Sequence, residues 1–356
     1  MSSPNKKVRN LTYAEALREA VVQEMDRDNR VFLFGLDVDD HKAILGSTRG
    51  LVDRFGPERV FCTPLSEDAM TGVAIGSAMA GMRPIHVHIR MDFLMLCMNQ
   101  LVNIAAKSHY MYGGQVKVPM VVRSMIGKSW GQGAQHSQGL HSMFMHVPGL
   151  KVVAPSNAHD AKGCMISAIR DDNPVIFVEH RLLYFTDSPV PDALFEVPFG
   201  KARRCTQGTD ITIVGISNMV VECIRSQELL ATGGISAEVI DPISLVPLDT
   251  ATIIESVRST GRLLVVDNAW LCCGASSEIV SRVAEALGGE QQIQVKRMGY
   301  AETTCPTSSV LEDVFYPNPV TIAKTAYSMV LPGNKDWEPD HESARLAYQV
   351  QFRGPF

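Results

Sequence analysis

Residues 12–35, TYAEALREAVVQEMDRDNRVFLFG, decide the fold class. Thr12 and Glu15 form the capping-box pattern of a helix start, and apolar side chains then recur at helical spacing as far as Asn29. Residues 31–35 follow as a continuous apolar run of strand length, the pattern of a parallel strand that is covered on both faces. The stretch therefore predicts a helix that leads into a buried strand.

The same alternation continues along the chain and predicts two α/β sheets. Further strands of the first sheet are expected at 60–62, 84–89, 118–125, 150–153 and 174–178, with helices at 66–81, 92–110 and 158–170. Strands of the second are expected at 210–217, 237–240, 263–267 and 292–297, with helices that begin near 218, 249 and 274. The expected fold class is α/β, with two domains that each have a mostly parallel sheet flanked by helices.

A composition change separates the two domains. Residues 186–200, TDSPVPDALFEVPFG, hold three prolines and no helical period, which is typical of a linker. The expected organisation is an N-terminal extension at 1–10, a first domain at 11–185, this linker, a second domain at 201–330 and a tail at 331–356. The tail is rich in proline and charge and is expected to wrap a neighbouring surface or to stay loose.

Composition narrows the possible environments and partners. The 356 residues carry 33 basic and 38 acidic side chains, a net charge of −5, and the basic residues are scattered, which argues against a nucleic-acid partner. We expect no membrane partner because no apolar run reaches the ~18 residues of a spanning helix. The N-terminus leads into no apolar signal segment, and the eight cysteines include no CxxC spacing, so we expect reduced thiols in the cytoplasm. The adjacent Cys272 and Cys273 are expected to be buried thiols.

The segment TPLSED, at 63–68, joins the end of a strand to the start of a helix. Ligands of parallel α/β sheets bind just beyond the carboxyl ends of the strands. Glu67 is therefore either an ordinary helix-start carboxylate beside an N-cap Ser66, or an acid that projects into a cleft. The helix that follows has small residues at Gly72, Gly76 and Ala80, a pattern that favours tight packing against another helix or subunit.

The segment PIHVHIRM, at 84–91, places His86, His88 and Arg90 on one side of a strand. Two histidines at this spacing could bind a metal, but no carboxylate or cysteine nearby in the sequence completes a ligand set. A polar strand face beneath a cleft is the favoured interpretation.

The segment GKSWGQGAQHSQG, at 127–139, is a glycine-rich loop that contains His136. It matches neither the GxxxxGK[ST] nor the GxGxxG phosphate-binding pattern, so a nucleotide site is weakly indicated. His136 is either a proton shuttle or a hydrogen-bonded loop histidine. Farther on, the helix that ends at 170–174, RDDNP, either holds a cation on its exposed carbonyls or ends as an ordinary helix before a strand.

Several longer sequence segments, in the same order along the chain as in the family, resemble the β subunit of the decarboxylating component of 2-oxo acid dehydrogenase complexes of the pyruvate and branched-chain type. The resemblance runs from about 11 to 330. The words that carry it include TPLSE at 63–67, GVAIGSAMAGMRPI at 72–85, GAQHSQ at 133–138, PGLKVVAPSNAHDAKG at 148–163, AIRDDNPVIFVEH at 168–180 and GTDITIVG at 208–215.

The resemblance implies a thiamine diphosphate enzyme with a transketolase-like pyrimidine-binding domain followed by a transketolase C-terminal domain. It implies that Glu67 hydrogen-bonds N1′ of the aminopyrimidine, that Leu65 and Met91 contact the cofactor, and that His136 handles the intermediate or the lipoyl acceptor. It also implies a structural K⁺ on backbone carbonyls, which belong to Met120, Ala168, Ile169, Asp171 and Asn173.

The Mg²⁺–diphosphate motif of such enzymes is absent from this chain. The resemblance therefore implies a separate α subunit that holds Mg²⁺, an α₂β₂ heterotetramer with the cofactor between subunits, a 2-oxo acid substrate and a lipoyl acyltransferase core as a further partner. There are departures, since Met91 stands where the family has an aromatic residue, Val87 where it has an acid, and Arg90 where it has a small polar residue.

These departures keep an alternative in view, a split transketolase or acyloin synthase subunit that forms C–C bonds. A non-catalytic subunit that has kept the fold is a second alternative, and the presence of Glu67 argues against it.

Overall fold

The computed structural model describes residues 8–40, 42, 44–128, 131–334, 337–340 and 342–344. The described chain divides into two compact units. The first comprises 8–126 and 143–199, and the second comprises 127–142 and 200–344. The sequence placed 127–142 within the first domain, but these loop residues pack with the second unit, for reasons given with the candidate site.

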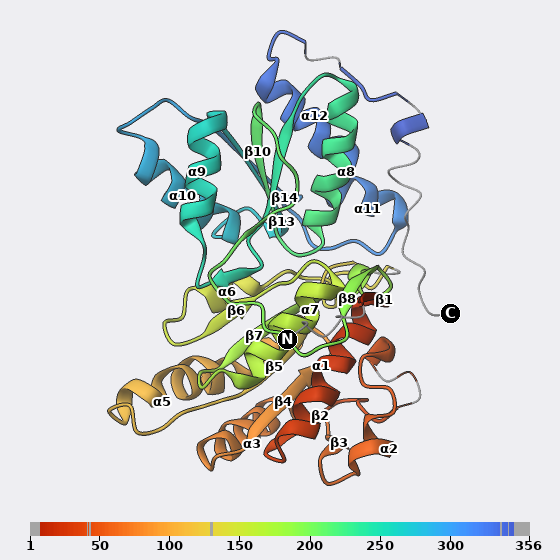
Figure 1. The fold of residues 1–356 in the computed structure, drawn as a ribbon, viewed down its shortest axis with the longest axis vertical. Helices are drawn as coiled ribbons and strands as arrows, with labels where there is room; N and C mark the ends of the chain where they lie inside the picture. Colours follow the sequence, from red (N-terminus) through yellow and green to blue (C-terminus); the bar gives the residue numbers. More distant parts are fainter. Residues whose placement is uncertain are drawn as a thin grey trace, which may run out of the picture. The chain divides into compact units, whose positions relative to one another are not determined.

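The first unit is built on a parallel sheet whose neighbouring strands run in the order β6-β7-β5-β4-β2-β3. Helices α1 and α7 pack side by side over this sheet, and α3 packs against β4 (Figure 1). The strands are β2 Val31–Gly35, β3 Val60–Cys62, β4 Arg83–His88, β5 Val121–Ile126, β6 Lys151–Val153 and β7 Val175–His180. The helices are α1 Tyr13–Arg27, α2 Leu51–Phe55, α3 Glu67–Met79, α4 Met91–Leu94, α5 Ala106–Met111, α6 His141–Met145 and α7 Ala158–Arg170, and α6 continues from the loop of the second unit.

The helix starts follow from local chemistry. The capping box of Thr12 and Glu15 is confirmed, with both reciprocal bonds present. Asn157 caps α7 by accepting from the backbone N–H of Asp160 at 2.9 Å. Ser66 is the N-cap residue of α3, as expected, although its side chain makes no cap hydrogen bond.

The helix expected at 92–110 is helical along its length but irregular. Its hydrogen-bond period changes from α4 through a 3₁₀ turn at Met95–Cys97 to a π-helix at Asn99–Ala105, before α5 begins. The pattern of apolar positions does not reveal such changes, because all three helix types keep one side of the segment toward the core. Two other 3₁₀ turns lie at Ile44–Gly46 and Arg181–Leu183.

The segment expected to be an unstructured linker contains a strand. β8 Asp187–Pro191 pairs antiparallel with β1 Val8–Thr12, so the N-terminal extension and the linker form a small two-stranded sheet. Proline fits here because a two-stranded sheet leaves one edge of each strand free of ladder bonds. The buried ammonium of Lys162 anchors the end of β8 by donating to the carbonyl of Pro191 at 2.8 Å and to the carboxylate of Glu19 at 2.6 Å.

The second unit has a sheet with the order β14-β13-β10-β11-β9, in which only β9 runs antiparallel to its neighbour. Helices α8 and α12 cover one face, and α9 and α10 lie together on the other (Figure 1). Its strands are β9 Arg203–Arg204, β10 Ile211–Gly215, β11 Ala237–Asp241, β13 Arg262–Trp270 and β14 Gln294–Tyr300, and the short β12 Ser244–Val246 of this unit lies outside this sheet. The helices are α8 Met219–Thr232, α9 Thr250–Thr260, α10 Ala275–Leu287, α11 Ser309–Phe315 and α12 Pro319–Val330.

Part of the predicted tail packs against the second unit. The ring of Trp337 stacks on Tyr327 of α12, with centroids 4.2 Å apart, and Glu338 pairs with Lys324 of the same helix. This agrees with the expectation that the tail wraps a neighbouring surface, for the tail residues that the structure describes.

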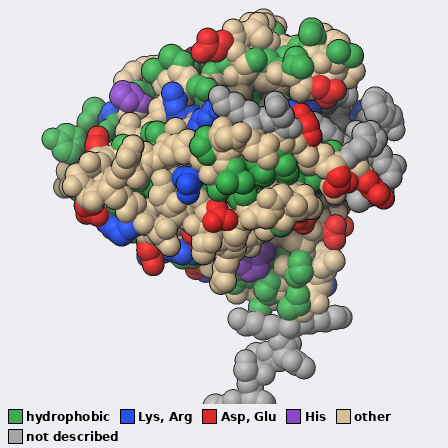
Figure 2. All heavy atoms as spheres, turned by 90° about the horizontal axis from the view of Figure 1, so that it is seen from above, with side chains coloured by type: hydrophobic (Ala, Val, Ile, Leu, Met, Phe, Trp, Pro, Cys, Tyr) green, Lys and Arg blue, Asp and Glu red, His purple; other side chains and the backbone are tan. Residues whose placement is uncertain are grey.

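Charged side chains of both signs are interspersed on the face drawn in Figure 2, with small apolar groups between them. Within the described ranges, no helix combines the length and the apolar character that crossing a membrane requires.

A buried ion pair crosses the centre of the first sheet. Arg123 on β5 donates from Nε to Oε1 of Glu179 on β7 at 2.6 Å and from Nη2 to Oε2 at 2.9 Å. The Arg123 Nη2 also donates to Oγ of Ser47 at 2.8 Å, and the hydroxyl of Tyr184 donates to Glu179. Arg123 and Glu179 are both 1% exposed, so removal of either partner leaves the other charge buried.

We predict that Glu179→Gln lowers the free energy of unfolding by about 3–5 kcal/mol, because it leaves the Arg123 guanidinium buried beside a neutral amide. The matched control is Glu278→Gln, which breaks an exposed pair with Arg282 and is expected to cost at most about 1 kcal/mol. Urea denaturation midpoints measure both changes. Equal midpoints for the two variants would contradict the assignment of Arg123 and Glu179 as a structural pair.

Candidate active site

Glu67 is the first residue of α3, and four residues separate it from the end of β3 at Cys62. The end of β3 is fixed against its neighbour because the backbone N–H of Thr63 donates to the carbonyl of Gly35 at 3.1 Å. The Glu67 side chain is half-buried, and among the described residues no hydrogen bond or ion pair engages its carboxylate. The carboxylate is therefore available to a ligand at this edge of the sheet.

The carboxylates at the start of α3 influence the pKa of one buried thiol, that of Cys97. Burial raises the pKa of Cys97 to about 11, and the carboxylates of Glu67 and Asp68 add to this effect, while a hydrogen bond with Thr71 opposes it. The Thr71 hydroxyl also lies 3.3 Å from Nε2 of His88 on β4. The first turns of α3, the end of β4 and the 3₁₀ turn that contains Cys97 thus form one packed cluster.

His86 and His88 lie side by side at the end of β4, both buried. The His86 ring stacks on Phe34 of β2, with centroids 4.5 Å apart. Burial lowers the pKa of His86 to about 4, and burial together with His86 lowers the pKa of His88 well below its usual value. Both rings are therefore neutral near pH 7. No group of three or more His, Cys, Asp or Glu side chains able to hold a metal occurs among the described residues.

The two other predicted cofactor contacts differ in exposure. Leu65 is 79% exposed, which is unusual for a leucine and leaves its side chain free to contact a ligand. Met91 is fully buried at the start of α4, so its side chain offers no surface to a ring in this chain. Burial also lowers the pKa of the neighbouring Arg90, whose Nε is buried without a hydrogen-bond partner among the described atoms.

The glycine-rich loop with His136 belongs to the second unit because its glycines pack against backbone and side chains there. A Cβ on Gly131 would lie 2.4 Å from the Thr307 carbonyl oxygen, and one on Gly139 would lie 1.7 Å from that of Asn268. Gly131 has a φ of +68°, in the left-handed region that favours glycine. Only glycine therefore allows the loop to lie this close to the second unit.

Two further contacts anchor the loop on either side of His136. The hydroxyl of Tyr300 on β14 donates to the carbonyl of Ser137 at 3.4 Å. The Nε2 of His141 lies 3.0 Å from Oδ1 of Asp267 on β13, a contact of two fully buried side chains that lacks hydrogen-bond geometry. His136 itself is half-buried, and its backbone N–H donates to the carbonyl of Gly133 at 3.3 Å.

Sequence reasoning missed His141 and Asp267 as a pair. They are 126 positions apart, and only the fold brings them together. The only local hint in the sequence was a second histidine, His141, five residues after His136, and nothing nearby in the sequence indicated its partner.

Two of the five carbonyls expected to bind potassium have a cationic partner, the guanidinium of Arg83. The Nη1 of Arg83 donates to the carbonyls of Ile169 at 2.9 Å and of Asp171 at 3.0 Å, and its Nη2 pairs with Asp172 at 2.7 Å. The Met120 carbonyl accepts from the backbone N–H of Val175 at 2.9 Å. A guanidinium thus supplies the positive charge at two of the five carbonyls. The remaining two belong to Ala168 and Asn173.

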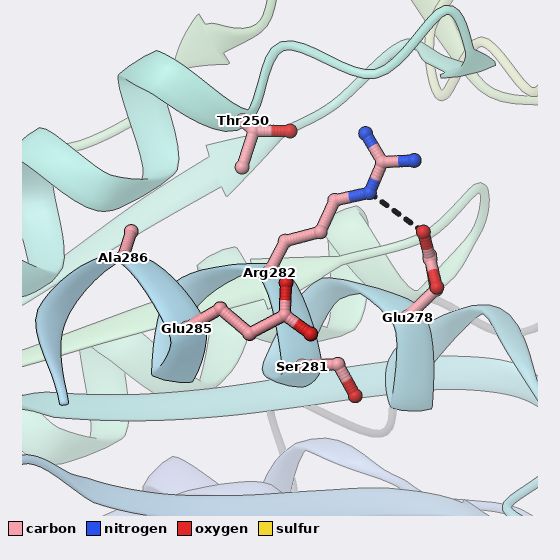
Figure 3. A pocket seen from close by; sticks show the side chains of 6 residues that line it. All are labelled: Thr250, Glu278, Ser281, Arg282, Glu285 and Ala286. Carbon is pink, nitrogen blue, oxygen red and sulfur yellow. Dashed lines mark hydrogen bonds and ion pairs between the residues drawn. The ribbon is translucent and has the colours of Figure 1, made fainter.

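A surface hollow in the second unit does not have the character of a binding site. It lies between the start of α9 and one side of α10, and it is open to solvent (Figure 3). Its arginine, Arg282, already donates to Glu278 at 2.6 Å along α10. The lining residues are Thr250, Glu278, Ser281, Arg282, Glu285 and Ala286.

Family models match most of the chain. Residues 9–186 match the transketolase pyrimidine-binding domain, and residues 200–322 match the transketolase C-terminal domain. The fold is similar to that of a solved split-gene transketolase, described as an inactive β4 tetramer, with a TM-score of 0.73 at 22% identity over 90% of this chain and 98% of that one. Fold, edge carboxylate and domain order together define a transketolase-like enzyme subunit.

Curated relatives are more similar in sequence. The β subunit of acetoin:2,6-dichlorophenolindophenol oxidoreductase from Cupriavidus necator is 42% identical over 89% of this chain and 97% of its own. The β subunit of the pyruvate dehydrogenase E1 component from Rickettsia felis is 41% identical, over 86% and 94%. The mitochondrial β-1 subunit of the same component from Arabidopsis thaliana is 40% identical, over 87% and 86%. The chain belongs to this thiamine-diphosphate-dependent family of E1 β subunits.

We predict that His86 makes stability depend on pH. Its pKa is about 4 when folded and about 6.5 in an unfolded chain. Between these values the unfolded chain binds a proton that the folded chain does not, so the free energy of unfolding falls as pH drops below 6.5. From pH 7.5 to pH 5 this contribution is about 2 kcal/mol.

The variant His86→Phe keeps an aromatic ring against Phe34 and should lose that share of the pH dependence. Chemical denaturation at the two pH values measures it, with the exposed His146→Gln as the control. An unchanged pH dependence in His86→Phe would contradict the lowered pKa.

Proposed function

We propose that this chain is the β subunit of an enzyme that decarboxylates a 2-oxo acid on thiamine diphosphate and transfers the acyl unit to lipoamide. The observation that carries the proposal is the unengaged Glu67 carboxylate at the strand edge in a chain about 40% identical to E1 β subunits. The relatives do not favour the alternative of C–C bond formation, because the likeness to transketolases lies at 22% identity and below and concerns the fold.

The residues at this edge fit the aminopyrimidine end of the cofactor. Glu67 offers a carboxyl group that can share a proton with a ring nitrogen, and Leu65 offers an exposed apolar side chain beside it. Met91 is buried and does not fit as a platform for the ring. When bound, the cofactor supplies the carbon nucleophile and the electron sink for decarboxylation.

The role of Glu67 is to hold and move one proton at its carboxyl oxygen. The neutral His86 and His88 nearby add no competing charge near pH 7. We assign to His136, on its anchored loop, contact with the acyl intermediate or the acceptor.

The chain's own residues leave the diphosphate end to a partner. The Gly-Asp-Gly motif that accompanies Mg²⁺ is absent from the sequence. The proposal therefore includes an α subunit that holds Mg²⁺ and the diphosphate, in an α₂β₂ heterotetramer, with a lipoyl acyltransferase core as acceptor.

The five backbone carbonyls of Met120, Ala168, Ile169, Asp171 and Asn173 do not fit a potassium site. Arg83 holds two of the five carbonyls and is itself paired with Asp172. A second cation at the same oxygens would meet the guanidinium charge at short range. We therefore assign the cation of this cluster to Arg83 in place of K⁺.

We predict that Glu67→Gln, assembled with the α subunit, lowers CO₂ release from 2-oxo acids by at least about 100-fold, because an amide cannot exchange the proton. 2,6-Dichlorophenolindophenol serves as acceptor, so that loss of lipoamide docking cannot mimic loss of chemistry. The control is Asp68→Asn, the exposed acid next along the helix, which is expected to keep most of the activity. Turnover of Glu67→Gln close to that of the wild type would refute the proposed function.

We predict that the unfolding midpoint is the same in KCl and in NaCl of equal ionic strength. A bound K⁺ at 100 times its dissociation constant would instead stabilise the chain by about 2.7 kcal/mol. Arg83→Met should lower the midpoint in both salts, whereas Arg258→Met, which breaks an exposed pair with Glu290, should change it little. Specific stabilisation of the wild type by K⁺ would overturn the assignment to Arg83.

A further inference from the structure

Cys272 and Cys273 lie in the turn between β13 and α10, and both are exposed. The sequence predicted buried thiols at these positions, and that prediction was wrong. Cysteine is usually buried in folded proteins, but β13 ends at Trp270, before the two cysteines, and the sequence does not show where the strand ends. Nothing in the proposed function uses these two side chains.

The turn that carries the two thiols is held from several directions. The carbonyl of Leu271 accepts from Nη1 of Arg297 at 2.7 Å and from the hydroxyl of Ser277 at 3.0 Å. A Cβ on Gly274 would lie 2.4 Å from the Trp270 carbonyl oxygen, so the chain leaves the turn along a path that only glycine allows. The backbone of the turn is thus fixed, and this keeps the two adjacent side chains close to each other.

The two Sγ atoms are 4.0 Å apart. A disulfide needs an S–S distance of about 2.05 Å and usually joins Cα atoms about 4.4–6.8 Å apart. Neighbouring residues have Cα atoms only about 3.8 Å apart, so a disulfide between them is strained. In contrast, two bonds of about 2.3 Å to one bridging atom place their sulfurs roughly 3.4–3.8 Å apart, the lower value for the narrower angles at a pyramidal atom such as As(III). The observed separation therefore suits one bridging atom and not a direct S–S bond.

The backbone and the charges support the same arrangement. Cys273 has a φ of +51°, a conformation that non-glycine residues rarely adopt and that the surrounding bonds maintain. The neighbouring Cys273 sulfur raises the pKa of Cys272, and Glu302 adds to this effect while Arg297 opposes it. Cys272 therefore stays a protonated thiol near pH 7.

We propose that Cys272 and Cys273 form a vicinal dithiol site that binds one thiophilic atom, with trivalent arsenicals as the ligand class. In the reaction two S–H bonds and the As–O bonds of R–As=O break, two S–As bonds form, and the oxygen leaves as water with the two thiol protons. No oxidant or reductant is required. The site is independent of Glu67 and of the proposed function.

The test uses the full chain, reduced with a phosphine, and one equivalent of phenylarsine oxide. Intact mass measurement should show one phenylarsenic group per chain with the loss of two hydrogens. The adduct should survive a large excess of glutathione, a monothiol, and should be removed by dimercaptopropanol, a dithiol. Peptide mapping should show that the adduct protects Cys272 and Cys273 from alkylation.

Cys272→Ser and Cys273→Ser are each expected to lower adduct formation in the presence of glutathione by at least tenfold. Cys62→Ser, which removes an exposed single thiol, should leave it unchanged. An adduct that glutathione removes from the wild type would overturn the proposal, as would an adduct that persists in Cys272→Ser. Rapid conversion of the pair to a disulfide by diamide, seen as the loss of two hydrogens from the 272–273 peptide, would overturn the preference for a bridging atom. The wild-type mapping keeps the test decisive if a serine variant folds poorly.

Discussion

The parallel pairing of β2 with both β3 and β4 constrains everything else in the first unit. At Gly35 the backbone of β2 approaches β4 so closely that a Cβ would lie 2.3 Å from the carbonyl oxygen of Val87. The register pairs Gly35 with Cys62 on one side and with Val87 on the other, so the three strands end at one edge of the sheet. Since Glu67 follows β3, and the histidines and Arg90 lie at the end of β4, this pairing collects the polar residues at that edge.

The first sheet contains charged and polar groups in its interior, and their charge states affect the electrostatics at its edge. The Arg123–Glu179 pair is satisfied across β5 and β7, and the His86 and His88 rings are kept neutral by burial. The charges of these buried groups are therefore fixed near pH 7. In the second unit, close glycine contacts and the buried contact between His141 and Asp267 fix the position of the loop that contains His136.

Much of the fold could be predicted because local signals agreed with the packing. The capping box at Thr12, the buried run of β2 and the N-terminal start of α7 are properties of short segments, and their bounds differ little from those expected. Glu67 could be identified as a candidate because a strand end and a helix start meet within four residues. Its proton role came from the resemblance and not from spacing, since the same residues also describe an ordinary helix start.

What the sequence could not reveal depends on contacts between distant residues. The exposure of Cys272 and Cys273 follows from where β13 ends, and the burial of Met91 follows from how α4 packs. The partner of the α7 carbonyls is Arg83, 86 positions before Ile169, and no local pattern connects them. Gly72 and Gly76 of α3, expected to pack tightly, have no atom within 4 Å of an added Cβ in the described part of this chain.

The most direct measurement of the central claim is the rate at which the thiazolium C2 proton of thiamine diphosphate exchanges with deuterium in the assembled α and β subunits. This exchange reports the proton transfer assigned to the carboxylate without requiring substrate, decarboxylation or an acceptor. The account predicts that the wild-type assembly accelerates exchange over the free cofactor and that Glu67→Gln loses at least about 100-fold of that rate. Equal exchange rates in the wild type and in Glu67→Gln, with the cofactor bound in both, would contradict it.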